Sequence, residues 1–257
     1  MSPAAARSVW LPREHGAWAF LLLPYLAGVA LAPPRPVLLP LGMTWIGGYL
    51  LLAGLTPWLT ARRRRPPRDL AVLAALVAAS AVVTIALAPW LLAWALAYVP
   101  LVSASVWWTV RGQARTLRND ATTMLAAALS TAVVVDATGT ALDSRVWLTV
   151  VVLFAYFFGT ALSVKTMLRQ RGERRYVTAS VLYHAALVPG AVAVILVSGA
   201  PPSRAWPLVV VAFVLLGRAI AGPLVNRRRA RPLRPAVVGA GEIVLSVAVL
   251  AATLLLH

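Results

Sequence analysis

A guanidinium, a carboxylate and an imidazole stand side by side in the stretch Pro12 to Trp18, directly before an apolar run. Glu14 and His15 could exchange protons with a ligand, as these groups do in general acid–base catalysis, and Arg13 could hold an anionic group. We therefore predict Glu14 and His15 as catalytic residues and Arg13 as a ligand-binding residue. Two alternatives stay open. The helix dipole favours a carboxylate such as Glu14 near a helix start, and His15 could be an interfacial side chain.

Three ionisable residues interrupt the last three apolar runs, where a charge is costly and therefore informative. Glu242 lies about 10 Å inside its run and Arg218 about 12 Å inside, at about 1.5 Å per residue. His184 lies at a similar depth, so all three reach one level. We predict Glu242 as a catalytic acid or base and Arg218 and His184 as ligand-binding residues. The alternatives are a structural ion pair and a histidine that hydrogen-bonds between packed helices.

Lys165, the only lysine of the chain, is a further ligand-binding candidate. Helical spacing places Tyr156, Thr160 and Ser163 on one face of its run and Lys165 on the opposite side. We expect the long side chain of Lys165 to reach toward lipid headgroups, with ligand binding as the alternative.

The elements that must position these residues are long apolar runs. Hydrophobic residues make up 61% of the 257 residues and charged residues 12%, which excludes an ordinary soluble domain. A hydrocarbon core of about 30 Å takes roughly 17–25 residues to cross. Nine runs fit, at about 17–33, 37–60, 70–88, 89–110, 121–138, 145–168, 177–198, 205–226 and 235–256. We expect an all-α polytopic transmembrane helical bundle that forms one integral membrane domain, residues 1–257.

Two details of these runs bear on the count. Only Ala88-Pro89 divides the third run from the fourth, and the fifth run is marginal, so eight spans are the alternative to nine. The Asn119-Asp120 pair stands just before the fifth run, and we expect it to cap that helix.

The basic residues predict the orientation. Arginine-rich loops follow the second, fourth, sixth and eighth runs, whereas the opposite loops hold only Arg35, Arg145 and Arg204. The positive-inside rule then places the N-terminus in the cytoplasm and the C-terminus outside, in a bacterial plasma membrane. This pattern also explains the net charge of +17 without nucleic acid as a partner. The expected partner is the lipid bilayer.

Several kinds of site are missing from the sequence. There is no cysteine, and no P-loop, HExxH or G-x-S-x-G motif. The histidines number three, one of them at the end of the chain. We therefore expect no metal site and no cofactor.

The chain resembles the YwiC-like family of bacterial membrane proteins. The resemblance rests on the stretch Pro12 to Trp18, on Ser163-x-Lys165 with the later Arg171-x-Glu173-Arg174-Arg175, on Tyr183-His184, and on Arg234-Pro235 through Gly239 to Glu242. It covers nearly the whole chain, and its most specific part is the first. The family implies no particular activity.

The nine-span plan also looks like that of the UbiA-type prenyltransferases, whose active site opens to the cytoplasm. Those enzymes use aspartate-rich motifs in two loops to hold Mg²⁺ and diphosphate. The corresponding loops here offer only Asp69 and Glu173, and a divalent cation needs several oxygen ligands. A UbiA-like arrangement is therefore conceivable, but Mg²⁺-diphosphate chemistry is not expected.

Three functions remain open at this point, and enzyme activity is undecided among them. The first is a UbiA-like scaffold that binds an anionic-headed lipid or an isoprenoid in a polar pocket facing the cytoplasm. The second is a small-solute or proton-linked transporter in which Glu242 and His184 form a relay. The third is a non-catalytic assembly factor in which every embedded charge is a structural pair.

Overall fold

The computed structural model describes residues 17–60, 68–168, 170–228 and 235–257, and every statement below concerns this part of the chain. Its helices are α1 (Ala17–Leu31), α2 (Leu38–Thr60), α3 (Arg68–Leu87), the 3-10 helix η1 (Pro89–Trp94), α4 (Ala95–Val110), α5 (Leu117–Ala137), α6 (Ser144–Leu168), α7 (Arg174–Ser198), α8 (Pro202–Arg228) and α9 (Pro235–Leu254). No strand occurs among the described residues, so the predicted all-α class is confirmed.

The described helices confirm a multi-pass bundle. Eight of them are long and apolar enough to cross a membrane, with η1 and α4 counted as one. The exception is α1, whose 15 residues reach about 22 Å at about 1.5 Å per residue. It ends at Leu31, short of the predicted residue 33, because Pro33 and Pro34 follow and the residue before a proline disfavours the helical region.

Two junctions refine the sequence-based boundaries. The Ala88-Pro89 break is real, and the chain turns there through η1 before α4 begins. The predicted cap of the fifth span is wrong by a few residues. The side chain of Thr116 accepts from the backbone N–H of Asn119, so Thr116 is the N-cap and α5 begins at Leu117. Asn119 and Asp120 lie inside its first turn instead.

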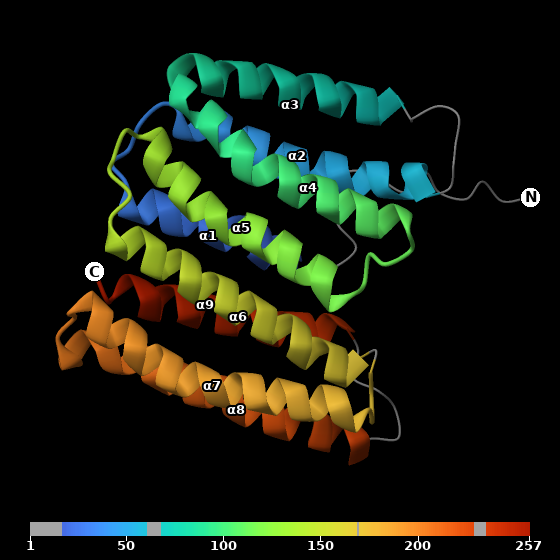
Figure 1. Cartoon of the computed structure of the whole chain (residues 1–257), viewed down its shortest axis with the longest axis vertical. Helices are drawn as coiled ribbons and strands as arrows, with labels where there is room; N and C mark the ends of the chain where they lie inside the picture. The colour runs from blue at the N-terminus through green and yellow to red at the C-terminus, as the bar shows by residue number, and fades with distance from the viewer. Residues whose placement is uncertain (1–16, 61–67, 169, 229–234) are drawn as a thin grey trace, which may run out of the picture.

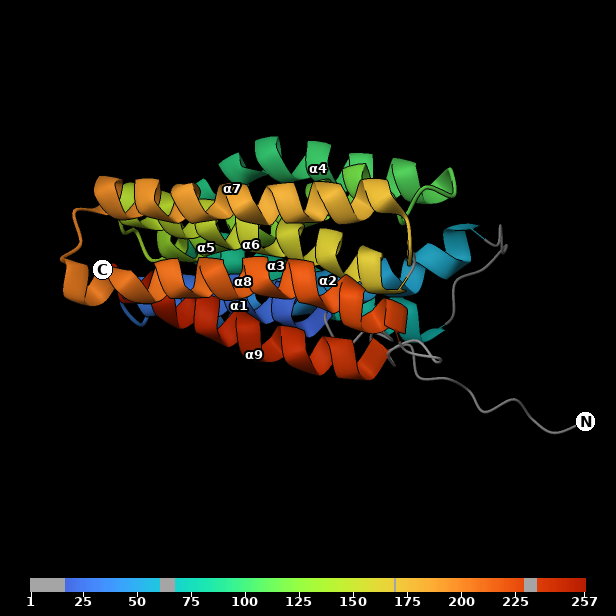
Figure 2. The same ribbon diagram turned by 90° about the horizontal axis from the view of Figure 1, so that it is seen from below.

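The helices lie side by side as one row of neighbouring pairs (Figures 1 and 2). At one edge α3 packs on α2, and at the other edge α7 packs on α8. Between these edges, α5 packs on both α1 and α6, and α9 contacts α1, α6 and α8. We call α1–α5 the N-terminal half and α6–α9 the C-terminal half.

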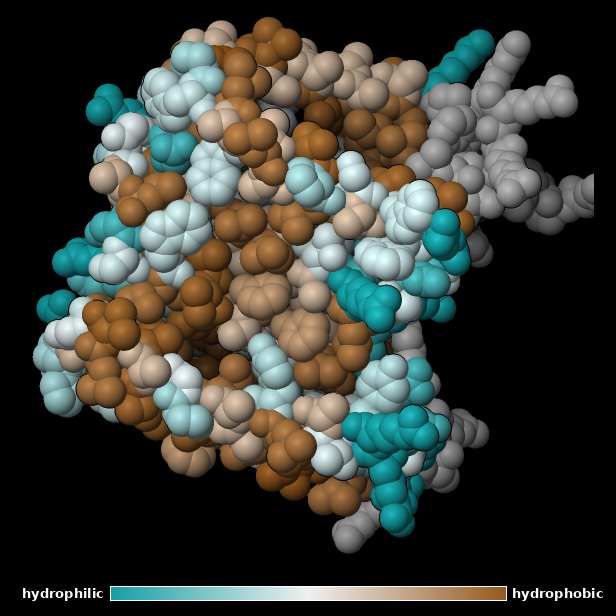
Figure 3. Space-filling view, viewed as in Figure 1, coloured by the Kyte–Doolittle hydropathy of each residue, from teal (hydrophilic) through white to brown (hydrophobic). Residues whose placement is uncertain are grey.

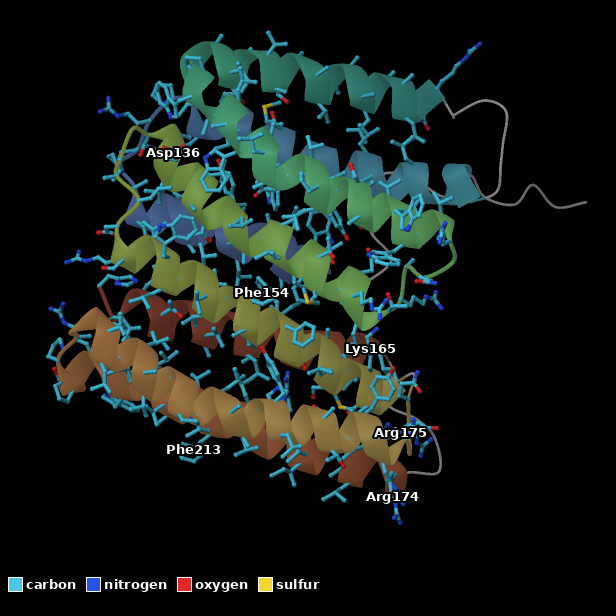
Figure 4. The ribbon with its side chains drawn as sticks, in the orientation of Figure 1. Asp136, Phe154, Lys165, Arg174, Arg175 and Phe213 are labelled. Atoms are coloured by element: carbon cyan, nitrogen blue, oxygen red, sulfur yellow. The ribbon has the colours of Figure 1, made fainter. Side chains whose placement is uncertain are left out.

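Most of the basic side chains lie at one end of the bundle. Lys165, Arg174 and Arg175 lie at one end, and Asp136 lies at the other (Figure 4). We call the first the basic end; it includes the starts of α3, α5 and α7. Between the ends the surface is mostly apolar (Figure 3). Large side chains such as Val244 and Leu182 are 70% and 64% exposed there, as expected for surfaces that face lipid.

Neutral polar groups hold the N-terminal half together. Thr131 on α5 donates to the carbonyl of Pro24 on α1 at 2.9 Å. Trp45 on α2 donates to the carbonyl of Leu21 at 2.8 Å. The backbones come close beside these bonds, because a Cβ on Gly28 would lie 2.7 Å from the carbonyl oxygen of Thr131. Small residues and hydroxyl groups of this kind let helices associate where lipid offers no hydrophobic drive.

Candidate functional site

His184, Arg218 and Glu242 meet inside the C-terminal half. One terminal nitrogen of the Arg218 guanidinium, Nη1, donates to Glu242 Oε2. The other, Nη2, lies 3.3 Å from His184 Nε2. The side chains of Arg218 and Glu242 are only 14% and 7% exposed, and His184 is fully buried. The predicted convergence of the three residues on one level is confirmed, while their catalytic and ligand-binding roles stay predictions.

Hydroxyl groups from α6 and α9 bond to Glu242, one to its carboxylate and the others to its backbone carbonyl. Thr160 Oγ1 donates to Glu242 Oε2 at 3.3 Å. Tyr156 OH lies 2.8 Å from Ser246 Oγ and donates to the backbone carbonyl of Glu242 at 3.1 Å. The stripe of Tyr156 and Thr160 is visible in the sequence, but only the packing of α9 against α6 turns it into part of this site.

A glycine makes room for the histidine. A Cβ on Gly159 of α6 would lie 3.0 Å from His184 Nε2, so α6 and α7 approach closely there. The other ring nitrogen of His184, Nδ1, lies 2.7 Å from the carbonyl oxygen of Ser180. A carbonyl oxygen can only accept, so Nδ1 carries the proton. Nε2 then keeps its lone pair and accepts from Arg218, which can only donate.

The pairing of charges explains how the cluster survives in an apolar bundle. An isolated charge at this depth would be costly, whereas a paired one with further hydrogen bonds is tolerated. The predicted alternative of an Arg218–Glu242 ion pair therefore describes the geometry correctly. An ion pair and a site are compatible, because the pair can stand at the wall of a cavity.

An apolar cavity of about 120 Å³ adjoins the cluster. On α8 it is lined by Leu208 and Leu215, and the next residue along that stripe is Arg218. On α9 it is lined by Val249, which is seven residues beyond Glu242 on the same face. The cavity wall on these two helices thus leads into the ion pair.

The same continuity holds on the other two helices. On α6 the lining residues Val152 and Tyr156 are followed, at a spacing of four, by Thr160. On α7 the lining residue Leu187 lies three positions beyond His184. All four helices therefore pass from an apolar wall to a polar side chain along one face. The cavity lies on the side of the cluster away from the basic end.

Toward the basic end, side-chain to backbone bonds tie the helices together. Asn226, fully buried on α8, donates from Nδ2 to the carbonyl of Met167 on α6 at 2.6 Å. Arg171 donates to the carbonyl of Asn226 at 2.8 Å. The sequence predicts a polar pocket that opens at the basic end, whereas this cavity is apolar and lies on the other side of the cluster. The polar pocket therefore stays a prediction.

Lys165 is not part of the cluster. Its Nζ lies 2.7 Å from Asp120 Oδ2 on α5 and donates to the carbonyl of Arg115 at 2.5 Å. The side chain is 8% exposed, so the expectation that it reaches toward lipid headgroups is wrong. It does point away from the stripe of Tyr156, but α5 covers that side of α6. Its role in ligand binding stays a prediction, and it would concern the contact between α5 and α6 and not the cluster of His184, Arg218 and Glu242.

Arg13, Glu14 and His15 lie outside the described residues. Their predicted catalytic and ligand-binding roles therefore stay predictions. Among the residues that the structure does describe, no group of three or more histidine, aspartate or glutamate side chains is placed to hold a metal ion.

Comparisons with known proteins support the resemblance drawn from the sequence. Residues 11–135 match the family model described as YwiC-like protein. An uncharacterized protein of Haemophilus influenzae is 25% identical over 175 residues, which are 68% of this chain and 74% of that protein. The uncharacterized protein YwiC of Bacillus subtilis is 26% identical over 176 residues, 68% of this chain and 73% of its own length. No solved structure matches.

Proposed function

We propose that this chain, which matches the YwiC-like family model over residues 11–135, binds a lipid or isoprenoid drawn from the membrane. The apolar chain of the ligand occupies the cavity among α6, α7, α8 and α9, and its polar end meets the cluster of His184, Arg218 and Glu242. One observation carries this proposal. On α7, α8 and α9 the face that lines the apolar cavity continues into a residue of the cluster, and on α6 it continues into Thr160, which bonds to Glu242.

The size and lining of the cavity support this proposal. Ligand sites are typically concave and mostly apolar, with a few polar groups that fix orientation. A cavity of about 120 Å³ is close to the roughly 150 Å³ apolar cavity that takes up benzene. It therefore accepts the end of an apolar chain.

The finer placement is part of the same proposal. The basic end faces the cytoplasm of a bacterial cell, in accordance with the positive-inside rule. In this orientation the cavity lies closer to the outer leaflet than the cluster does. A UbiA-like arrangement of the helices is also part of the proposal. The proposed function does not require enzyme activity, because lipid binding alone accounts for the cavity.

Two glycines provide a matched test. Gly190 lines the cavity, and Gly217 faces outward from α8; a Cβ on either would meet no atom within 4 Å. Gly190→Leu should fill the cavity, whereas Gly217→Leu should leave it free. The protein is extracted gently, and the lipids that purify with it are compared with bulk membrane by mass spectrometry.

The expected result is a lipid enriched in the native protein and in Gly217→Leu and reduced at least tenfold in Gly190→Leu. Thermal unfolding of both variants checks that the fold survives. If no lipid is enriched over bulk membrane, or if Gly190→Leu retains it fully, the proposal is wrong.

Proton-linked transport is the second candidate, favoured by the contact that joins His184 and Glu242 through Arg218. Arginine keeps its proton in proteins, so a relay between the two would need a path around Arg218. Uptake into proteoliposomes that responds to pH and disappears in Glu242→Gln would favour this function. Uptake that is unchanged in Glu242→Gln would exclude Glu242 from it.

A further inference from the structure

The cluster carries no net charge. Arg218 contributes one positive charge and Glu242 one negative charge, and the two are paired directly. His184 is neutral, because its Nδ1–H donates to the carbonyl oxygen of Ser180 and its Nε2 accepts from Arg218. The polar end of the cavity therefore offers no uncompensated positive charge to a ligand.

One hydrogen-bond donor of the cluster is unused. Arg218 Nε is buried and has no hydrogen-bond partner among the described residues. Such a group is costly to leave unpaired in an apolar interior. Arginine can only donate, so the missing partner is an acceptor. Arg218 lies three residues beyond the lining residue Leu215 on α8, and from this spacing we infer that the donor faces the end of the cavity.

The cavity also lies open toward the hydrocarbon between two helices. Val151 on α6, which belongs to the lining, is 54% exposed, and Gly190 on α7 is exposed as well. The lining residues behind them are buried: Leu208 is 5% exposed and Val249 is 1% exposed. Figure 3 shows the apolar surface hollowed over α6 and α7. A ligand can therefore reach the cavity sideways without crossing a headgroup region.

We propose that the ligand is an uncharged lipid, with a hydroxyl or carbonyl group at its polar end, that enters from the bilayer between α6 and α7. Its oxygen accepts a hydrogen bond from Arg218 Nε, and its apolar chain fills the cavity. This inference rests on the proposed function and names the class of ligand for the same site. It replaces the anionic headgroup expected from the sequence.

An anionic headgroup fits this site poorly. It would bring a second negative charge beside Glu242 while only one positive charge is present. Either the headgroup or Glu242 would then be left as an uncompensated charge in a medium of low dielectric constant, which is strongly unfavourable. A neutral acceptor adds the missing hydrogen bond and leaves the ion pair intact.

Two pairs of ligands with matched tails test the charge directly. The protein in phosphatidylcholine nanodiscs is titrated with radiolabelled hexadecan-1-ol or hexadecanoate, and separately with farnesol or farnesyl phosphate. The ligand that dissolves in the lipid is measured with Gly190→Leu, whose cavity is filled, and is subtracted from the total. Gly217→Leu, whose cavity is free, serves as the positive control. We expect at least one alcohol to bind at least tenfold more tightly than its anionic counterpart.

Arg218→Lys separates the hydrogen bond from the ion pair. Lysine keeps the positive charge for Glu242 but has no Nε–H at that position. We expect the affinity for the alcohol to fall at least fivefold, and the thermal stability to fall much less than in Glu242→Ala, because the ion pair remains while the bond to His184 is lost. If Arg218→Lys binds the alcohol as tightly as the native protein does, Arg218 Nε is not the donor and the inference is wrong.

The outcomes distinguish this inference from the proposed function. If an anionic ligand binds as tightly as its alcohol, and Gly190→Leu abolishes that binding, the function stands and the inference is overturned. If none of the four ligands binds more to the native protein than to Gly190→Leu, both are overturned.

Discussion

The two halves of the bundle use different polar contacts to join their helices. In the N-terminal half, helices are joined by neutral donors that bond to backbone carbonyls: Thr131 to Pro24 at 2.9 Å and Tyr98 to Ala126 at 2.9 Å. No ion pair joins the described parts of α1–α5 to one another. In the C-terminal half, the charges of Arg218 and Glu242 stand at the centre of the polar contacts.

This difference shows what each half is suited for. A hydroxyl or indole group needs one acceptor, and for Thr131, Trp45 and Tyr98 a backbone carbonyl of a neighbouring helix supplies it. The ionised groups need each other, and they still leave a donor unused beside a cavity. The match to the YwiC-like family model covers α1 to most of α5, whereas the candidate cluster lies in the other half.

The largest effect should come from breaking the ion pair. Glu242→Ala leaves Arg218 as an unpaired buried charge and should lower the free energy of unfolding by about 3–5 kcal/mol. Tyr98→Phe, which removes a neutral bond in the N-terminal half, should lower it by less than about 1 kcal/mol. Unfolding in mixed micelles, followed by circular dichroism, measures both. Similar losses in the two variants would erase the contrast between the halves.

A double variant separates structure from function. Replacing both charges, as Arg218→Met with Glu242→Leu, removes the buried charges together and should restore most of the stability. If this variant is stable and still binds the membrane lipid, the cluster serves only to assemble the bundle. We expect it to be stable and to have lost the ligand.

Close approach of helices should matter in both halves, but more in the first. Gly28→Ala would place a Cβ 2.7 Å from a backbone oxygen of Thr131, which cannot move aside, and should cost about 1–3 kcal/mol. Gly159→Ala meets the side chain of His184 at 3.0 Å, which can shift slightly. Its main effect should be on the nitrogen chemical shifts of His184 in an NMR spectrum. Gly48→Ala, with no atom within 4 Å, is the control for both, and a loss of stability there as large as in Gly28→Ala would contradict this account.

A single neutral bond should contribute little by itself. Thr131→Val keeps the shape of the side chain and removes the bond to Pro24, which should lower the free energy of unfolding by about 0.6 kcal/mol. Thr122→Val removes only a bond to the carbonyl of Arg118 within α5 and should change the stability less. A loss of several kcal/mol in Thr131→Val would mean that the N-terminal half depends on this bond far more than proposed.

The smallest effect concerns pH and the C-terminal half. Burial, and then the charge of Arg145, lower the pKa of His257 below its ordinary value of 6.5, while Asp143 opposes the change. The unfolded chain therefore binds this proton more readily than the folded protein. Its contribution to stability is complete above pH 6.5 and is lost as the pH falls from 6.5 through the lowered pKa. In His257→Gln the free energy of unfolding should fall less steeply over this pH range than in the native protein. Identical slopes of unfolding free energy against pH in the two proteins would refute the assignment to His257.

The sequence predicted the class of fold, most span boundaries and the meeting of His184, Arg218 and Glu242. These follow from local properties: apolar length, prolines, and the depth of a charge along a helix. A charge in an apolar run also has few acceptable partners, which is why the convergence could be predicted.

The sequence could not show which helix covers which face. Lys165 was predicted to reach the headgroups because its face of α6 looks free in the sequence, but α5 lies there with Asp120. The cavity was invisible for a related reason. Apart from Tyr156, its lining of valine, leucine, alanine and glycine does not differ in composition from a surface that faces lipid. Only the packing of four helices distinguishes the two.

The ion pair also has a consequence for how the chain is made. Glu242 is synthesised 24 residues after Arg218, so α8 emerges from the ribosome before its charge has a partner. An unpaired arginine within a span disfavours insertion by about 2.5–3.5 kcal/mol. We therefore expect α8 and α9 to enter the bilayer together as a hairpin. A chain that stops after α8 should insert that helix less completely than the full chain does.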